Sequence, residues 1–141
     1  MELEYRILAV DPGQKKIGLA VSDPTRTIAS PLTVLRHVSM AVDAARIAQT
    51  AEENHAQIIV VGQALGSEDD ATPSSRHAQK LAEMIRSQTE IPVILWDESG
   101  STRIARQARI EMGLTRERRS GHMDQMAAVV ILQTYLDERN R

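Results

Sequence analysis

The sequence predicts an α/β protein with a mixed five-stranded sheet, in which three antiparallel strands are followed by two parallel strands. Two observations carry this prediction. Two apolar runs flank the turn Asp11-Pro12-Gly13, which is typical of a β-hairpin. Two unbroken apolar runs, residues 58–62 and 93–96, alternate with helical patterns, as in parallel strands covered on both faces. Right-handed crossovers would put helices on both faces of the sheet.

The first half of the chain supplies the meander. The strand 7–10 leads into Asp11, the strand 15–21 returns, and Thr27 to Leu35 gives a third strand in which Pro31 indicates an edge or a bulge. Helical spacing begins after Ser39, a plausible N-cap, and ends near Asn54. The parallel part of the sheet begins with the strand that follows.

The second half of the chain alternates helices and strands. Residues 63–75 form a polar loop that suits either a binding loop or a plain surface loop. The expected elements after it are a helix through residues 78–85, a strand at 93–96, an arginine-rich helix at 104–112 and a last helix at about 122–137. The last helix is apolar nearly all round, so we expect it to be buried.

Composition limits the classes of function. The chain has 141 residues with 42% hydrophobic content, so we expect one domain spanning 1–141. With a net charge of −2, the protein lacks the overall positive charge that would by itself bind nucleic acid. The absence of cysteine excludes disulfides, thiolate zinc sites and cysteine nucleophiles. The N-terminus lacks an apolar signal core, and no run of residues is long and apolar enough for a membrane span. We expect a soluble cytoplasmic protein without a membrane partner.

Carboxylates follow the strands at one edge of the expected sheet. Asp11 ends the first strand and Asp97-Glu98 ends the last, and parallel strands bring their carboxyl ends to the same edge. Neighbouring strand residues face opposite ways, so only one of Asp97 and Glu98 can join Asp11. Asp124 begins the last helix on the stripe of Ala128 and Ile131, which would face the sheet. The pattern predicts a convergence of three acids.

Clustered carboxylates repel one another and persist most readily around a divalent cation. All-oxygen ligands favour Mg²⁺ or Mn²⁺, and a pair of such ions is suited to phosphodiester hydrolysis. Gly13 and Gly18, which lack a Cβ, would let a phosphate approach the backbone, although the fold alone could require both. Each acid also has a structural alternative. Asp11 could simply start a turn, Asp124 could favour a helix start, and Asp97 or Glu98 could cap a helix.

Four motifs in register resemble the YqgF-type pre-16S rRNA nuclease family, which is related to Holliday-junction resolvases and has a ribonuclease H-like fold. The motifs are Asp11-Pro12-Gly13 with Gly18, Val60-Val61-Gly62, Trp96-Asp97-Glu98 and Met123-Asp124-Gln125-Met126-Ala127-Ala128. The resemblance implies that Asp11, Glu98 and Asp124 are the catalytic and metal-binding acids. It implies metal-dependent, endonucleolytic processing of the 5′ end of pre-16S rRNA during ribosome biogenesis.

Two departures from the family pattern keep alternatives open. Ser99 stands where the family usually has arginine, and the loop carries Glu68-Asp69-Asp70, whose charge opposes a phosphate backbone. These features suit a non-enzymatic RNA-binding or assembly factor, while the resolvase relationship suits cleavage of structured DNA. An ATP-binding protein of the sugar-kinase or actin-like type is a rival interpretation of the turn after Asp11, but such proteins need a second domain to close over ATP, and we expect no room for one in 141 residues.

Cations near the acids are the expected contacts of a nucleic-acid backbone. They are Lys15, Lys16, Arg103, Arg106, Arg116, Arg118 and Arg119. Such side chains are also common on solvated surfaces. A duplex or junction substrate with related ends would suit a two-fold homodimer.

Overall fold

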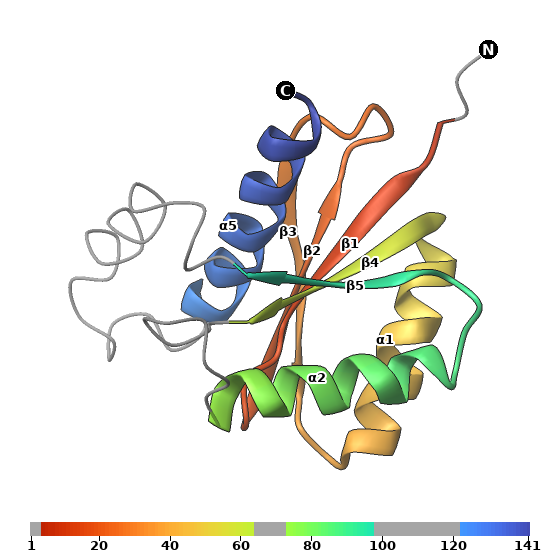
Figure 1. Cartoon of the computed structure of the whole chain (residues 1–141), viewed down its shortest axis with the longest axis vertical. Helices are drawn as coiled ribbons and strands as arrows, with labels where there is room; N and C mark the ends of the chain where they lie inside the picture. The colour runs from red at the N-terminus through yellow and green to blue at the C-terminus, as the bar shows by residue number, and fades with distance from the viewer. Residues whose placement is uncertain (1–3, 64–72, 98–121) are drawn as a thin grey trace.

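The computed structural model describes residues 4–63, 73–97 and 122–141, with side chains of the last range from Met126 onward. Its strands form one five-stranded sheet in the order β3-β2-β1-β4-β5 (Figure 1). Their bounds are β1 Arg6–Asp11, β2 Lys16–Ser22, β3 Ala29–Arg36, β4 Ala56–Gln63 and β5 Val93–Asp97. The first three strands pair antiparallel, and β1, β4 and β5 are parallel, which confirms the predicted fold class.

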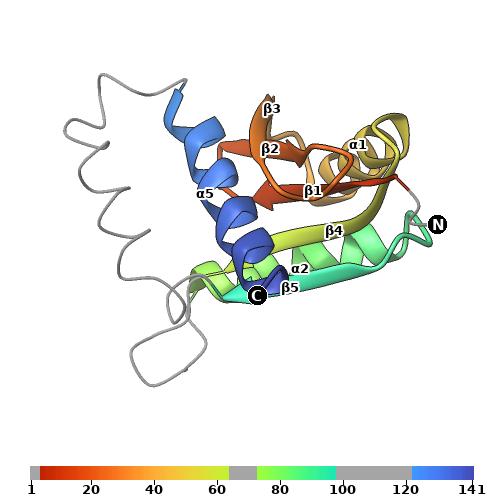
Figure 2. The same cartoon turned by 90° about the horizontal axis from the view of Figure 1, so that it is seen from above.

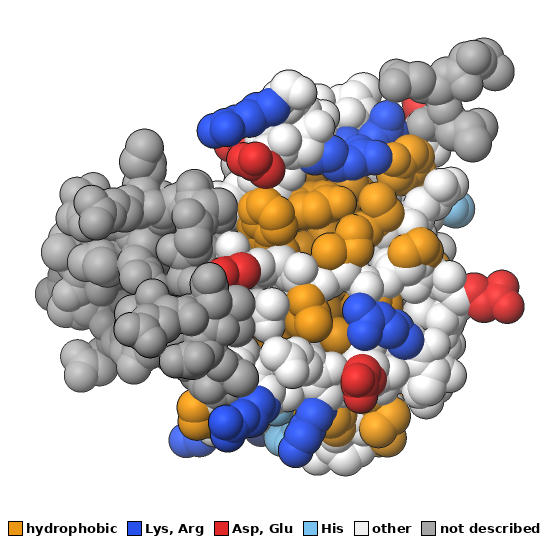
Figure 3. Space-filling model, viewed as in Figure 1, with side chains coloured by type: hydrophobic (Ala, Val, Ile, Leu, Met, Phe, Trp, Pro, Cys, Tyr) orange, Lys and Arg blue, Asp and Glu red, His pale blue; other side chains and the backbone are white. Residues whose placement is uncertain are grey.

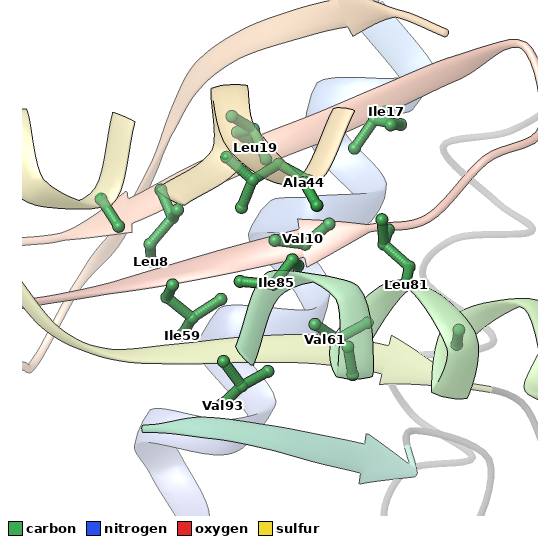
Figure 4. Packing of buried hydrophobic residues seen from close by; sticks show 14 of the residues in the cluster. Leu8, Val10, Ile17, Leu19, Ala44, Ile59, Val61, Leu81, Ile85 and Val93 are labelled. Atoms are coloured by element: carbon green, nitrogen blue, oxygen red, sulfur yellow. The ribbon is translucent and has the colours of Figure 1, made fainter. Parts of the chain in front are cut away.

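The helices divide between the two faces of the sheet (Figures 1 and 2). Their bounds are α1 Met40–Glu53, α2 Pro73–Arg86 and α5 His122–Arg139. Side chains of α1 and α2 pack with Leu8, Val10 and their neighbours on one face, as seen in Figure 4 with α5 behind the strands. On the other face, α5 packs against Ile7, Ala9 and Val60. Alternation along each strand therefore assigns every side chain either to the α1/α2 face or to the α5 face.

Local signals in the sequence explain several of these elements. Pro31 lies in the edge strand β3, beside a shift in the register between β2 and β3, as predicted. The Ser39 side chain caps α1 by accepting a hydrogen bond from the Val42 backbone N–H at 3.2 Å. The third strand begins two residues later and ends one residue later than predicted, and the last helix ends two residues later than predicted. No helix among the described residues is long and apolar enough to cross a membrane.

The expectation that the last helix is buried all round is wrong for its described part. Ala128, Ile131 and Leu132 are buried, but Val129 and Val130 are only half-buried. The reason is that α5 lies on a single face of the sheet, so only one stripe of its residues contacts the strands.

Hydrogen bonds fix the direction of α5 relative to β1. Arg139, in its last turn, donates to the Tyr5 hydroxyl just before β1 at 2.7 Å. The Gln133 side chain accepts from Ala29 N–H and donates to the Thr27 carbonyl, at 2.9 and 3.0 Å. Because the end of α5 lies beside the beginning of β1, the helix runs antiparallel to that strand. Its first turn is therefore directed toward the edge where β1 ends.

The loop between β2 and β3 is organised by the carboxylate of Asp23. It accepts backbone N–H groups from Ile28 and Thr27 at 2.8 and 2.7 Å and contacts the Thr25 hydroxyl. The Ile28 N–H, the Thr25 hydroxyl and the Thr27 N–H hold the pKa of Asp23 well below its usual range, because each stabilises the ionised form.

The low pKa of Asp23 predicts a pH-dependent contribution to stability. The contribution is complete above the unfolded-state pKa of about 3.9 and declines below it, because only the unfolded state then takes up a proton. At pH about 6, Asp23→Asn should lower the free energy of unfolding by about 1 kcal/mol, a modest value because the loop is exposed. Urea unfolding at pH about 6 and about 3 should show that the difference in the free energy of unfolding between wild type and variant becomes smaller at the lower pH. A difference that does not change with pH would contradict the role given to the ionised Asp23.

Candidate nucleic-acid cleavage site

Asp11 is the last residue of β1, at the carboxyl edge of the three parallel strands. Ile7 and Ala9 pack on the α5 face, and alternation puts Asp11 on the same face. Its side chain is half-buried, so it is open in part to solvent at the rim of the sheet. The prediction that the first strand carries Asp11 to this edge is confirmed.

The backbone of Asp124 lies in the first turn of α5. Its partners on the helical stripe, Ala128 and Ile131, are buried against the sheet, at 0% and 1% exposure. Since α5 runs antiparallel to β1, this stripe leads toward the sheet edge where Asp11 lies. The side chain of Asp124 lies outside the described part, so its convergence with Asp11 stays a prediction.

The structure separates Asp97 from Asp11. Asp97 pairs in register with Gln63, and the preceding residues of the same parity, Val93 and Leu95, pack on the α1/α2 face. Trp96 packs on the α5 face, where its indole N–H donates to Thr134 Oγ1 at 3.0 Å. Asp97 therefore belongs to the face opposite Asp11. A regular continuation of β5 would return the next position to the α5 face, but Glu98 lies outside the described residues.

Two glycines lie near Asp11, and the structure gives Gly13 a role in the hairpin turn. A Cβ on Gly13 would lie 2.1 Å from the Lys16 carbonyl oxygen, so the turn itself requires glycine there. Gly18 is the register partner of Asp11. A side chain at position 18 would stand beside the Asp11 carboxylate on the same face. Close approach of a phosphate to either glycine stays a prediction.

Among the predicted cations, the structure describes Lys15 and Lys16. Lys15 is exposed in the hairpin turn, and its carbonyl accepts a hydrogen bond from His37 N–H at 2.9 Å. Lys16 shares the α5 face with Asp11, because Ile17 packs on the other face. Figure 3 shows Lys and Arg side chains at the end of the molecule where β1 ends and α2 begins. The other predicted positions outside the described residues are Ser99, the acidic loop 68–70, Arg103, Arg106, Arg116, Arg118 and Arg119.

The structure adds a cation that sequence reasoning had not selected. Arg36, the last residue of β3, pairs in register with Lys16 and is exposed. The sequence signal for Arg36 was weak because the predicted strand ended one residue earlier. Its position beside Lys16 follows from the register of two strands, which the pattern of apolar residues does not specify.

A separate pair is formed by His37, in the connection between β3 and α1, and Asp43, in the first turn of α1. Asp43 is 2% exposed, contacts the His37 ring nitrogen Nδ1 and accepts the Val38 backbone N–H at 3.0 Å. These contacts close the connection between β3 and α1, and the pair lies beside the α1/α2 core, away from the face of Asp11. We interpret this pair as structural.

The donor set expected around Asp11 fits a hard divalent cation, because it consists of carboxylates and the chain has no cysteine. The described residues contain no group of three potential metal ligands. Asp11 is the one member of the predicted acid set whose side chain is described. The structure thus gives the position of one candidate ligand, Asp11, and the direction in which the helix that carries Asp124 runs relative to β1.

Comparisons with known proteins agree with this fold. The solved structure described as T. thermophilus RuvC in complex with Holliday junction substrate aligns with a TM-score of 0.63 at 12% identity, covering 96% of each chain. The fowlpox virus Holliday junction resolvase aligns with a TM-score of 0.57 at 16% identity, covering 94% of this chain and 99% of that one. At these identities the likeness establishes the ribonuclease H-like fold alone.

Curated relatives match at higher identity. Proteins named "Putative pre-16S rRNA nuclease" from Roseiflexus sp. and Anaeromyxobacter sp. are 34% and 38% identical to this chain. The matches cover 95% of both sequences in the first case, and 96% of this chain and 98% of the relative in the second. A family model described as "RuvX: Holliday junction resolvase" matches residues 5–138. The chain therefore belongs to the RuvX family.

Proposed function

We propose that this protein is a divalent-metal-dependent nuclease that cuts precursor 16S rRNA during ribosome biogenesis. The observation that carries the proposal is the position of Asp11. It ends β1, the central strand of the sheet, on the face that α5 covers and at the edge toward which the first turn of α5 is directed. The names of the relatives, which match nearly the whole chain, support the choice of substrate.

In this proposal, Asp11, Glu98 and Asp124 hold one or two Mg²⁺ or Mn²⁺ ions. Such ions, when bound, activate a water molecule and stabilise the charge that develops on the phosphate oxygens. Asp11 contributes a fixed ligand because β1 is paired on both sides, with β2 and with β4. The α5 helix contributes its acid from a buried stripe, so both ligands are carried by rigid elements.

A second candidate is the cleavage of four-way DNA junctions. The description of the family and the fold of the junction-bound RuvC favour it. The chemistry at the metal site would be the same, so the two functions differ only in the substrate that the surrounding surface accepts.

Cleavage assays on matched substrates test the function. Purified protein should cut labelled precursor rRNA with Mg²⁺ or Mn²⁺, and chelation with EDTA should abolish the reaction because the carboxylates alone cannot activate water. A four-way DNA junction and a linear duplex of the same sequence serve as comparison substrates. Faster cleavage of the junction than of precursor rRNA would favour the second candidate. Cleavage of no substrate with either metal ion would contradict both candidates.

A further inference from the structure

We infer that Lys16 and Arg36 together form a phosphate-binding rim that carries the nucleic-acid backbone away from Asp11 across β2 and β3. The inference deepens the proposed function and rests on it for the identity of the ligand. Its structural basis is independent of the acids, because it comes from the register and parity of the antiparallel strands.

The register puts these two cations next to the candidate catalytic position. Asp11 pairs with Gly18, and Gly18 pairs with Val34, which makes one row across three strands. The next row of the same parity toward the rim contains Lys16 opposite Arg36. Rows of equal parity are about 6.7 Å apart along a strand, so both side chains start near Asp11.

Parity also assigns both cations to the same face as Asp11. Ile17 and Leu35, the register pair just before them, are buried against α1 and α2. Lys16 and Arg36 therefore face the α5 side. The same alternation that puts Asp97 on the opposite face from Asp11 puts Lys16 and Arg36 on the same face as Asp11.

Positive charge gathers at this rim. Arg46 adjoins Arg36, since its guanidinium donates to the Arg36 carbonyl at 3.2 Å. A local concentration of positive charge attracts the negatively charged backbone of a nucleic acid.

The ligand that fits this arrangement is a phosphodiester backbone. Two cations in successive strands, one row away from the candidate metal site, match a linear chain of phosphates better than a single small anion. Such contacts position the backbone and read no base sequence. We therefore expect the same rim to serve RNA and DNA.

Binding measurements without divalent ions test the rim separately from cleavage. Fluorescence anisotropy with labelled single-stranded RNA, duplex DNA and a four-way junction would compare wild type, Arg36→Gln and Arg36→Glu over a range of salt concentrations. Arg36→Gln should weaken binding roughly tenfold at about 50 mM salt. The salt slope, meaning the steepness with which the logarithm of the binding constant falls with the logarithm of the salt concentration, should decrease by about 0.7–0.9, the effect of one lost phosphate contact. Lys16→Gln should act in the same way.

The matched control is Arg141→Gln, which removes the same charge from an exposed side chain near the end of α5, by the start of β1. It should leave the affinity and the salt slope unchanged. Arg36→Glu reverses the charge next to Lys16, so its binding to nucleic acid should be the weakest of the variants. Folding should survive, because Arg46 bonds to the backbone of Arg36 rather than to its side chain.

The outcomes separate this inference from the proposed function. If Arg36 variants bind like Arg141→Gln while wild type still cleaves, the rim is wrong and the nuclease stands. If the Arg36 variants bind weakly with a reduced salt slope but wild type cleaves no nucleic acid, the phosphate-binding rim is supported and the proposed nuclease function is wrong. A loss of binding that is equal at all salt concentrations and accompanied by a lower melting temperature would overturn the rim as well.

Discussion

Asp11→Asn should reduce the metal-dependent cleavage rate about a thousandfold while the protein remains folded. Loss of a charged metal ligand removes several kcal/mol of transition-state stabilisation, and each 1.4 kcal/mol corresponds to a tenfold change in rate. Asparagine has nearly the same shape, so β1 should keep its pairing with β2 and β4. Single-turnover kinetics with saturating Mg²⁺ measure the rate, and thermal unfolding monitors the fold.

The matched control is Asp97→Asn. Asp97 is also an aspartate at the carboxyl end of a parallel strand, but it lies on the α1/α2 face. Its substitution should change the rate by less than about threefold, the range typical of a change of about 0.5 kcal/mol outside a functional site. Equal losses for the two variants would contradict the separation by parity, and an unchanged rate for Asp11→Asn would refute the assigned site.

Gly62→Ala should destabilise the protein by about 1–3 kcal/mol and slow cleavage at least roughly tenfold. A Cβ at position 62 would lie 2.4 Å from Cδ1 and 2.9 Å from Cγ1 of Ile131, which is 1% exposed and has little room to move. The overlap would push α5 away from the end of β4. Because α5 carries Asp124, the displacement should disturb the proposed metal site as well as the core.

A double-mutant cycle tests this contact. Ile131→Val removes the Cδ1 atom and alone should cost about 0.5–1.5 kcal/mol. Combined with Gly62→Ala, it should restore part of the lost stability and rate, so that the two effects are not additive. Leu136→Val, a buried truncation further along α5, is the control and should add independently to Gly62→Ala. Additive effects in both cycles would mean that Gly62 does not set the position of α5.

Much of the fold could be read from local patterns. Ser39 was identified as the cap of α1 because its position before an apolar periodicity is a local signal, and the structure confirms it. Pro31 indicated an edge strand or a bulge, and β3 has both. The burial of α5 was overestimated, because an apolar sequence shows that a helix can be buried but not how many of its sides are covered.

The candidate site was less accessible to sequence reasoning. Asp11 could be chosen because a carboxylate after an apolar run at a turn is visible in the chain. For Gly13 the sequence left open both the approach of a phosphate and a requirement of the fold. The structure supports the second, because the Lys16 carbonyl occupies the space of its missing side chain, and the first stays a prediction. Arg36 was not selected, because its relation to Asp11 passes through the register of three strands.

The sequence by itself determined the order and type of the elements and the edge at which Asp11 lies, because strands, caps and turns depend on neighbouring residues. Only the tertiary structure decided which face each side chain shares. It put Asp97 on the face opposite Asp11, put Lys16 and Arg36 on the same face as Asp11, and directed the first turn of α5 toward that edge. There are two physical reasons. Alternation along a strand tells which side chains share a face, but which face is covered by which helix depends on how the helices pack. The register between strands is likewise fixed by packing between segments that are distant in the sequence.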